Sequence, residues 1–218
     1  MGNVEKVRML SPLPETTDEL CAVARAIGID PPDAVLYLGA RATEAQVKQL
    51  SGSGKLARAR IVHFATHGLI AGETTRLAKS RAEPSLILTP PITASDADDG
   101  LLTASEVTTL KLNADWVILS ACNTAAGDTV GGDAFSGFAR AFFYAGARSL
   151  LVSHWYVDSQ ATIRLINNAF RALKDDPKIG RAEAMRRAMS ALITAGGRNA
   201  HPTNWAPFVV VGEGGVGR

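Results

Sequence analysis

The chain has few of the residues that mark secreted, membrane or nucleic-acid-binding proteins. It has two cysteines in 218 residues, Cys21 and Cys122, which are too few for a disulfide framework, so a reducing, cytoplasmic location is expected. No apolar run is long enough to cross a bilayer, and residues 1–6 lack the apolar core of an export signal. Basic and acidic residues nearly balance, 23 against 21, and form no basic stripe. We therefore expect neither a membrane nor a nucleic acid as a partner.

Apolar residues make up 46% of the chain, enough to bury a full core, and they are arranged as alternating strands and helices. Several expected strands are continuous apolar runs, which is typical of a parallel sheet covered on both faces. The pattern predicts an α/β, three-layer sandwich with a mostly parallel central sheet. Residues 68–100 are the least regular part and contain one strand candidate, at residues 85–88. The other expected strands lie at residues 35–38, 61–65, 116–119, 149–153 and 205–211.

Helix-capping signals mark three of the expected helices. Thr43 opens a capping pattern for a helix that ends near Leu50, and Thr103 with Glu106 forms a capping box for a short helix toward Leu110. Thr17 is the expected N-cap of an earlier helix whose apolar face carries Cys21, which we expect in the core.

A histidine and a cysteine follow two of the buried strands. His67 follows the strand at residues 61–65, and Cys122 follows the strand at residues 116–119. Catalytic groups on parallel sheets collect beyond the carboxyl ends of the strands, so the two side chains can meet in one crevice. That is the layout of a thiol nucleophile and its base. The N–H groups of Gly68 and Cys122 could then hold a developing oxyanion.

Other interpretations of these residues remain open. Free cysteines are often small apolar residues of a core, and Cys122 fits that description as well. His63 and His67 do not form a zinc-protease pattern, so no metal and no cofactor are expected, and His63 is interpreted as packing or as support for a neighbouring residue. Residues 51–56 lack the end residues of a phosphate-binding loop, and no glycine fingerprint follows a strand. A nucleotide-binding domain is therefore disfavoured.

Eight short motifs follow one another along this chain in the order found in a known protein family. They are HFATHG (63–68), DGLLTA (99–104), LSACNT (119–124), GGD (131–133), ARAF (139–142), AGARS (145–149), SHWYVD (153–158) and HP with WAPF (201–208). In these motifs the chain resembles the CHAT domain, a caspase-like module of the caspase, separase and gingipain group of cysteine peptidases. The resemblance places this domain at residues 10–212, after a short extension at residues 1–9 and before a frayed tail at residues 213–218.

The resemblance implies a caspase-like fold in which His67 and Cys122 are the catalytic dyad that hydrolyses peptide bonds through a thioester. It also implies a carboxylate that binds a basic side chain before the scissile bond. Asp158, Asp128 and Asp133 are the candidates, and Asp158 could equally be a helix N-cap. The expected partners are a protein or peptide substrate and an upstream repeat-containing or activating protein.

A catalytically silent caspase-like scaffold is the alternative function. Tetratricopeptide repeats usually precede this domain, and further sheet-forming sequence usually lies upstream of Leu10. Because only residues 1–9 precede Leu10 here, we expect the first strand of the sheet to be short or absent.

Overall fold

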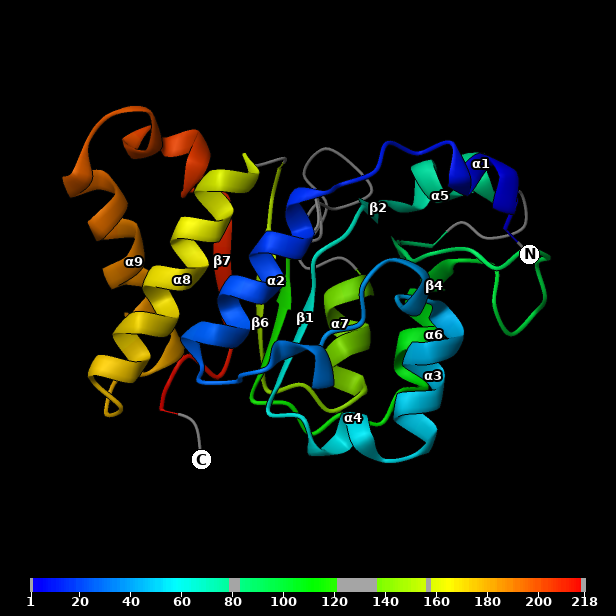
Figure 1. Cartoon of the computed structure of the whole chain (residues 1–218), viewed down its shortest axis with the longest axis horizontal. Helices are drawn as coiled ribbons and strands as arrows, with labels where there is room; N and C mark the ends of the chain where they lie inside the picture. Colours follow the sequence, from blue (N-terminus) through cyan, green and yellow to red (C-terminus); the bar gives the residue numbers. More distant parts are fainter. Residues whose placement is uncertain (1, 79–82, 121–136, 156–157, 217–218) are drawn as a thin grey trace.

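The computed structural model describes residues 2–78, 83–120, 137–155 and 158–216 (Figure 1). The helices are α1 (Val4–Arg8), α2 (Glu15–Ala26), α3 (Glu44–Gly52), α4 (Lys55–Arg58), α5 (Ala71–Leu77), α6 (Ala104–Thr108), α7 (Gly137–Tyr144), α8 (Ser159–Asp175) and α9 (Arg181–Ala195), with 3-10 turns η1 (Pro32–Ala34), η2 (Gly39–Arg41), η3 (Arg198–Ala200) and η4 (Pro202–Asn204). The strands are β1 (Ile61–Phe64), β2 (Gly68–Leu69), β3 (Ser85–Ile87), β4 (Leu101–Thr103), β5 (Trp116–Leu119), β6 (Ser149–Ser153) and β7 (Phe208–Gly212).

The central sheet has four strands in the order β1-β5-β6-β7. Strands β1, β5 and β6 are parallel, with Phe64 opposite Leu119 and Ile118 opposite Leu151. Strand β7 runs antiparallel to β6 and closes one edge of the sheet. The structure is thus mixed α/β with a mostly parallel central sheet, which confirms that part of the predicted fold class.

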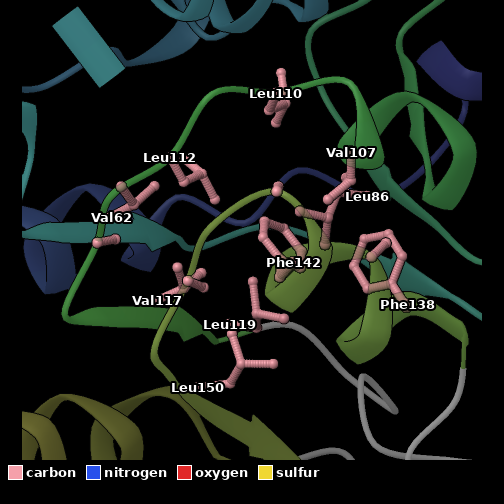
Figure 2. Packing of buried hydrophobic residues seen from close by; sticks show 14 of the residues in the cluster. Val62, Leu86, Val107, Leu110, Leu112, Val117, Leu119, Phe138, Phe142 and Leu150 are labelled. Atoms are coloured by element: carbon pink, nitrogen blue, oxygen red, sulfur yellow. The ribbon is translucent and has the colours of Figure 1, made fainter. Parts of the chain in front are cut away.

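Helices cover both faces of this sheet, as Figure 1 shows. Successive residues of β5 enter two different hydrophobic clusters because side chains alternate along a strand. Val117 and Leu119 pack with Phe142 of α7 on one face (Figure 2). Trp116 and Ile118 pack with α2, α8 and α9 on the other. Burial on both faces explains why β5 is apolar at every position.

A second, smaller sheet lies at the end of the molecule away from α9 (Figure 1). It is antiparallel, in the order β2-β3-β4, and it packs against α1 and α5 through the buried residues Val7, Ala78, Ile87 and Leu101. The region predicted to be irregular therefore contains β2 and α5 in addition to the expected strand.

Residues 35–38 are not a strand, so the sequence prediction was wrong there. Their apolar residues have strand propensity, but a strand also needs a neighbour with which to exchange backbone hydrogen bonds. In the described part of the chain these residues pair with no strand, and the Arg41 side chain donates to the Leu36 carbonyl oxygen at 2.9 Å.

Residues 99–104 form a tight corner that leads into β4. The Asp99 carboxylate, which is buried, accepts hydrogen bonds from the backbone N–H of Leu101 (3.1 Å) and of Gly2 (2.5 Å). Gly100 has φ of +81°, and a Cβ there would lie 2.9 Å from Pro90 Cβ. Thr103 caps α6, and its capping box with Glu106 is formed as predicted.

We predict that Gly100→Ala destabilises the fold by about 2 kcal/mol, because alanine would be strained at positive φ and would crowd Pro90. The measurement is urea unfolding at one pH. Gly72→Ala is the matched control, since Gly72 lies in α5 and a Cβ there meets nothing within 4 Å. Equal stabilities of the two variants would contradict the structural role of this corner.

Glu44 fixes the same corner from α3. Its side chain is only 1% exposed, and Oε2 accepts from the backbone N–H of Asp99 (2.8 Å) and of Gly100 (3.1 Å). Burial raises the pKa of Glu44 to about 7, although the hydrogen bonds from Lys48 and Asp99 act in the opposite direction. Thr43, the predicted N-cap of this helix, accepts from the N–H of Gln46.

The raised pKa of Glu44 makes stability depend on pH. Because this pKa lies above the unfolded value of 4.5, the folded chain binds the proton more tightly, so the stabilisation is complete below pH 4.5 and lost as pH rises through about 7. We predict that wild-type stability falls relative to Glu44→Gln by on the order of 2 kcal/mol between pH 5 and pH 8. Urea unfolding of both proteins across this range measures the difference. Parallel pH profiles would refute the prediction.

Candidate active site

The carboxyl ends of β1 and β5 meet at one edge of the central sheet, because the two strands are parallel neighbours. Ser120, the residue after β5, donates its backbone N–H to the Phe64 carbonyl oxygen at 3.0 Å. This bond holds the chain that leads to Cys122 against the chain that leads to His67. Cys122 itself, together with Asp128 and Asp133, lies outside the described residues.

His67 is half-buried just beyond β1, and its ring contacts the segment between α1 and α2. The Nε2 atom lies 2.7 Å from the backbone carbonyl oxygen of Ser11. A carbonyl oxygen only accepts hydrogen bonds, so Nε2 carries the proton and the neutral ring has its lone pair on Nδ1. The Ser11 contact fixes both the tautomer and the ring direction, and no side-chain pattern in the sequence could have identified it because the partner is a backbone atom.

Gly68 begins β2 immediately after this histidine. Ile87 donates its N–H to the His67 carbonyl oxygen at 2.9 Å, and Gly68 stands opposite Leu86 in the ladder. In an antiparallel pair, hydrogen-bonded and non-hydrogen-bonded positions alternate. The Gly68 N–H therefore points away from β3.

His63 lies on β1 within a buried polar cluster. Its Nε2 atom is 2.6 Å from Ser120 Oγ and 2.8 Å from Oε1 of Glu19 on α2. The side chains of His63 and Glu19 are 6% and 4% exposed. The Glu19 contact has the distance of an ion pair, but no hydrogen bond reaches this oxygen within the described residues.

This cluster is not a serine–histidine–acid triad. In such a triad the acid contacts the ring nitrogen opposite the one that faces the serine. Here both neighbours approach Nε2, while Nδ1 is buried with no hydrogen-bond partner in the described part of the chain. His63 thus joins α2, β1 and the end of β5, which agrees with its interpretation as packing or support.

Asp158 is the N-cap of α8. Its Oδ1 accepts a hydrogen bond from the Ala161 N–H at 3.0 Å, and the residue is exposed. The helix-cap interpretation is therefore confirmed. Cys21, which we expected in the core, is half-buried on α2.

The described residues contain neither a candidate metal site nor a candidate membrane-spanning helix. Among these residues no three His, Cys, Asp or Glu side chains gather in an arrangement that could hold a metal ion. No helix in the same ranges combines the length and the apolar character that spanning a bilayer requires.

Comparison with known proteins gave a family and two relatives. The family model of the CHAT domain matches residues 3–213. Tetratricopeptide repeat protein 28 of Homo sapiens is 29% identical over 227 residues, covering 93% of this chain and 8% of the human protein. The protein of the same name from Mus musculus is 28% identical, covering 93% of this chain and 9% of the mouse protein. The chain thus spans less than a tenth of the length of either relative.

Proposed function

Because the chain belongs to the CHAT domain family, which is caspase-like, we propose that it is a cysteine endopeptidase with His67 and Cys122 as its dyad. The observation that carries this proposal is the hydrogen bond between Ser11 and His67, which leaves the Nδ1 lone pair free to accept a proton. The Ser120–Phe64 bond adds support, since it brings the chain toward Cys122 alongside the histidine. We propose that the full arrangement is the caspase-like three-layer sandwich.

In the proposed reaction His67 Nδ1 takes the proton of the Cys122 thiol, and the sulfur attacks the scissile carbonyl carbon. The N–H groups of Gly68 and Cys122 stabilise the oxyanion, each by about 3 kcal/mol of barrier. His67 then protonates the leaving amine as the C–N bond breaks, which leaves a thioester. Water, deprotonated by His67, hydrolyses the thioester and restores the thiol.

We propose cleavage after a basic residue. A buried guanidinium or ammonium group needs a carboxylate partner, and the candidates remain Asp158, Asp128 and Asp133. In Asp158 the cap bond uses Oδ1, so Oδ2 is the atom that would meet a basic side chain. A peptide library tests this proposal, and cleavage after Asp that depends on Cys122 would overturn it.

A non-catalytic interaction module is the second candidate. The names of the relatives describe tetratricopeptide repeats, which supports a role beside a repeat-containing partner. Control by an upstream or activating protein is compatible with either candidate. We place the protein in the cytoplasm, where a reducing environment keeps Cys122 as a thiol.

Labelling with an arginyl peptide chloromethyl ketone separates the two candidates. We expect alkylation of one cysteine, with labelling lost in Cys122→Ala and in His67→Ala. Cys21→Ala is the matched control, because it removes the other cysteine and should leave labelling unchanged. Wild-type protein that stays unlabelled, alone and with a candidate partner, would favour the interaction module.

A further inference from the structure

Strand β1 has an open edge. In the four-stranded sheet, β5 is the only described strand that pairs with it. The carbonyl oxygens of Arg60 and Phe64 accept hydrogen bonds from residues at the two ends of β5, so the even-numbered residues of β1 face that strand. The backbone groups of Ile61 and His63 therefore face the opposite side, where no described residue bonds to them. Such an edge is a template for pairing with another strand.

An apolar groove of about 520 Å³ runs beside this edge. It is bounded by α2, residues 34–37, α3, α4 and β1. Ile27 and Val35 are 38% and 47% exposed there, and Val47 and Leu50 line the side formed by α3. Apolar walls on both sides of the groove suit a strand whose side chains are apolar on both faces.

The charged residues that line the groove are all basic or histidine, and none is a carboxylate. Arg60 is bound to Asp115, and Arg41 donates to the Leu36 carbonyl oxygen. Lys55, at the start of α4 beside the beginning of β1, is exposed and forms no ion pair with any described residue. The groove therefore favours an acidic residue at the end of its ligand that lies near Lys55.

We propose that this groove binds an extended apolar segment of a partner protein, which adds to β1 as a new edge strand. The backbone of the segment would satisfy the open groups of Ile61 and His63, its alternate side chains would contact Ile27 and Val35, and its carboxylate would meet Lys55. Four to five residues match the four residues of β1.

A second copy of this chain fits the groove less well than a partner segment. A second β1 edge would bring no carboxylate to Lys55, because the charged residues that line its own groove are basic or histidine. A helix or a small apolar molecule would fill the volume but would leave the edge N–H and C=O groups unpaired, which is costly. The inference does not depend on peptidase activity, so it is tested in Cys122→Ala protein.

The first measurement is fluorescence anisotropy with a labelled peptide that has a Val-Ile-Val-Ile-Val core and two glutamates at one end. Two versions carry the glutamates at the amino or the carboxyl end, because the strand could run in either direction. We expect one version to bind, and N-methylation of alternate amides to abolish its binding by removing the backbone donors. Failure of both versions to bind would overturn the proposal.

Variants of the protein locate the bound peptide. We expect the Ile27→Ser, Val35→Ser double variant to weaken binding roughly tenfold, while Ile193→Ser, which is 46% exposed on α9, has no effect. Lys55→Glu should weaken binding of the glutamate peptide and strengthen binding of a lysine version, whereas Lys174→Glu on α8 should change neither. Equal effects of the groove variants and their controls would place the peptide elsewhere.

Amide hydrogen exchange by NMR distinguishes strand addition from simple apolar contact. Peptide binding should slow exchange at the N–H groups of Ile61 and His63. Binding without this protection would overturn the proposed strand. If the protein formed concentration-dependent dimers that compete with the peptide, a second copy of this chain would be the partner that binds the β1 edge, and the proposal would be overturned.

Discussion

If the chain is the proposed peptidase, His67→Ala should lower kcat/KM for an arginyl peptide substrate by about 10³-fold, because it removes the proposed base that takes the Cys122 proton and returns it to the leaving amine. The Ser11 carbonyl holds Nε2 and leaves Nδ1 free for this transfer. The measurement is hydrolysis of a fluorogenic peptide by the wild-type and variant proteins. Cys122→Ala should lose at least as much activity.

Controls for this prediction separate chemistry from folding. Added imidazole should restore part of the activity of His67→Ala but none of the activity of Cys122→Ala, since only the first variant keeps the proposed nucleophile. His201→Ala removes an exposed histidine whose ring bonds Thr203, and it should leave kcat/KM near the wild-type value. Full activity of His67→Ala would contradict the assignment of His67 and Cys122 as the catalytic dyad.

Replacing His63 by leucine should destabilise the fold by about 3 kcal/mol, because the Glu19 carboxylate would stay buried without the polar contact that it now has. Adding Glu19→Leu should recover more than about 1 kcal/mol, since the double variant buries no carboxylate there. Urea unfolding of wild type, both single variants and the double variant gives the coupling free energy.

The matched control for this double-mutant cycle is His201→Leu. We expect it to lower the free energy of unfolding by less than about 1 kcal/mol, because the His201 ring caps only a short 3-10 turn. A double variant as unstable as the sum of its two single variants would show that His63 and Glu19 do not interact. If His63→Leu lost less stability than His201→Leu, the buried cluster of His63, Glu19 and Ser120 would contribute little to the stability of the fold.

Elements whose signals are local could be predicted from the sequence. The capping box of Thr103 and Glu106 needs only neighbouring residues, and both of its hydrogen bonds are present. The uninterrupted apolar run of β5 indicated burial on two faces, which the sheet confirms. Thr17 was a wrong N-cap, because α2 begins at Glu15 and its cap position is Pro14.

Predictions that depended on distant residues were less successful. Residues 35–38 have the composition of a strand, but strand formation requires a partner strand, and these residues have none in the described structure. Likewise, nothing local to Glu19 reveals that it is buried against His63, since the two residues lie on different elements.

The order of the motifs, the apolar strand runs and the caps were set by the amino-acid sequence alone, because each depends on residue type and short spacing. Folding decided which groups meet: the Ser11 carbonyl with the His67 ring, Glu19 with His63, and a basic, apolar groove beside the open edge of β1. These contacts join residues far apart along the chain, and only the packing of helices against the sheet brings their atoms within reach.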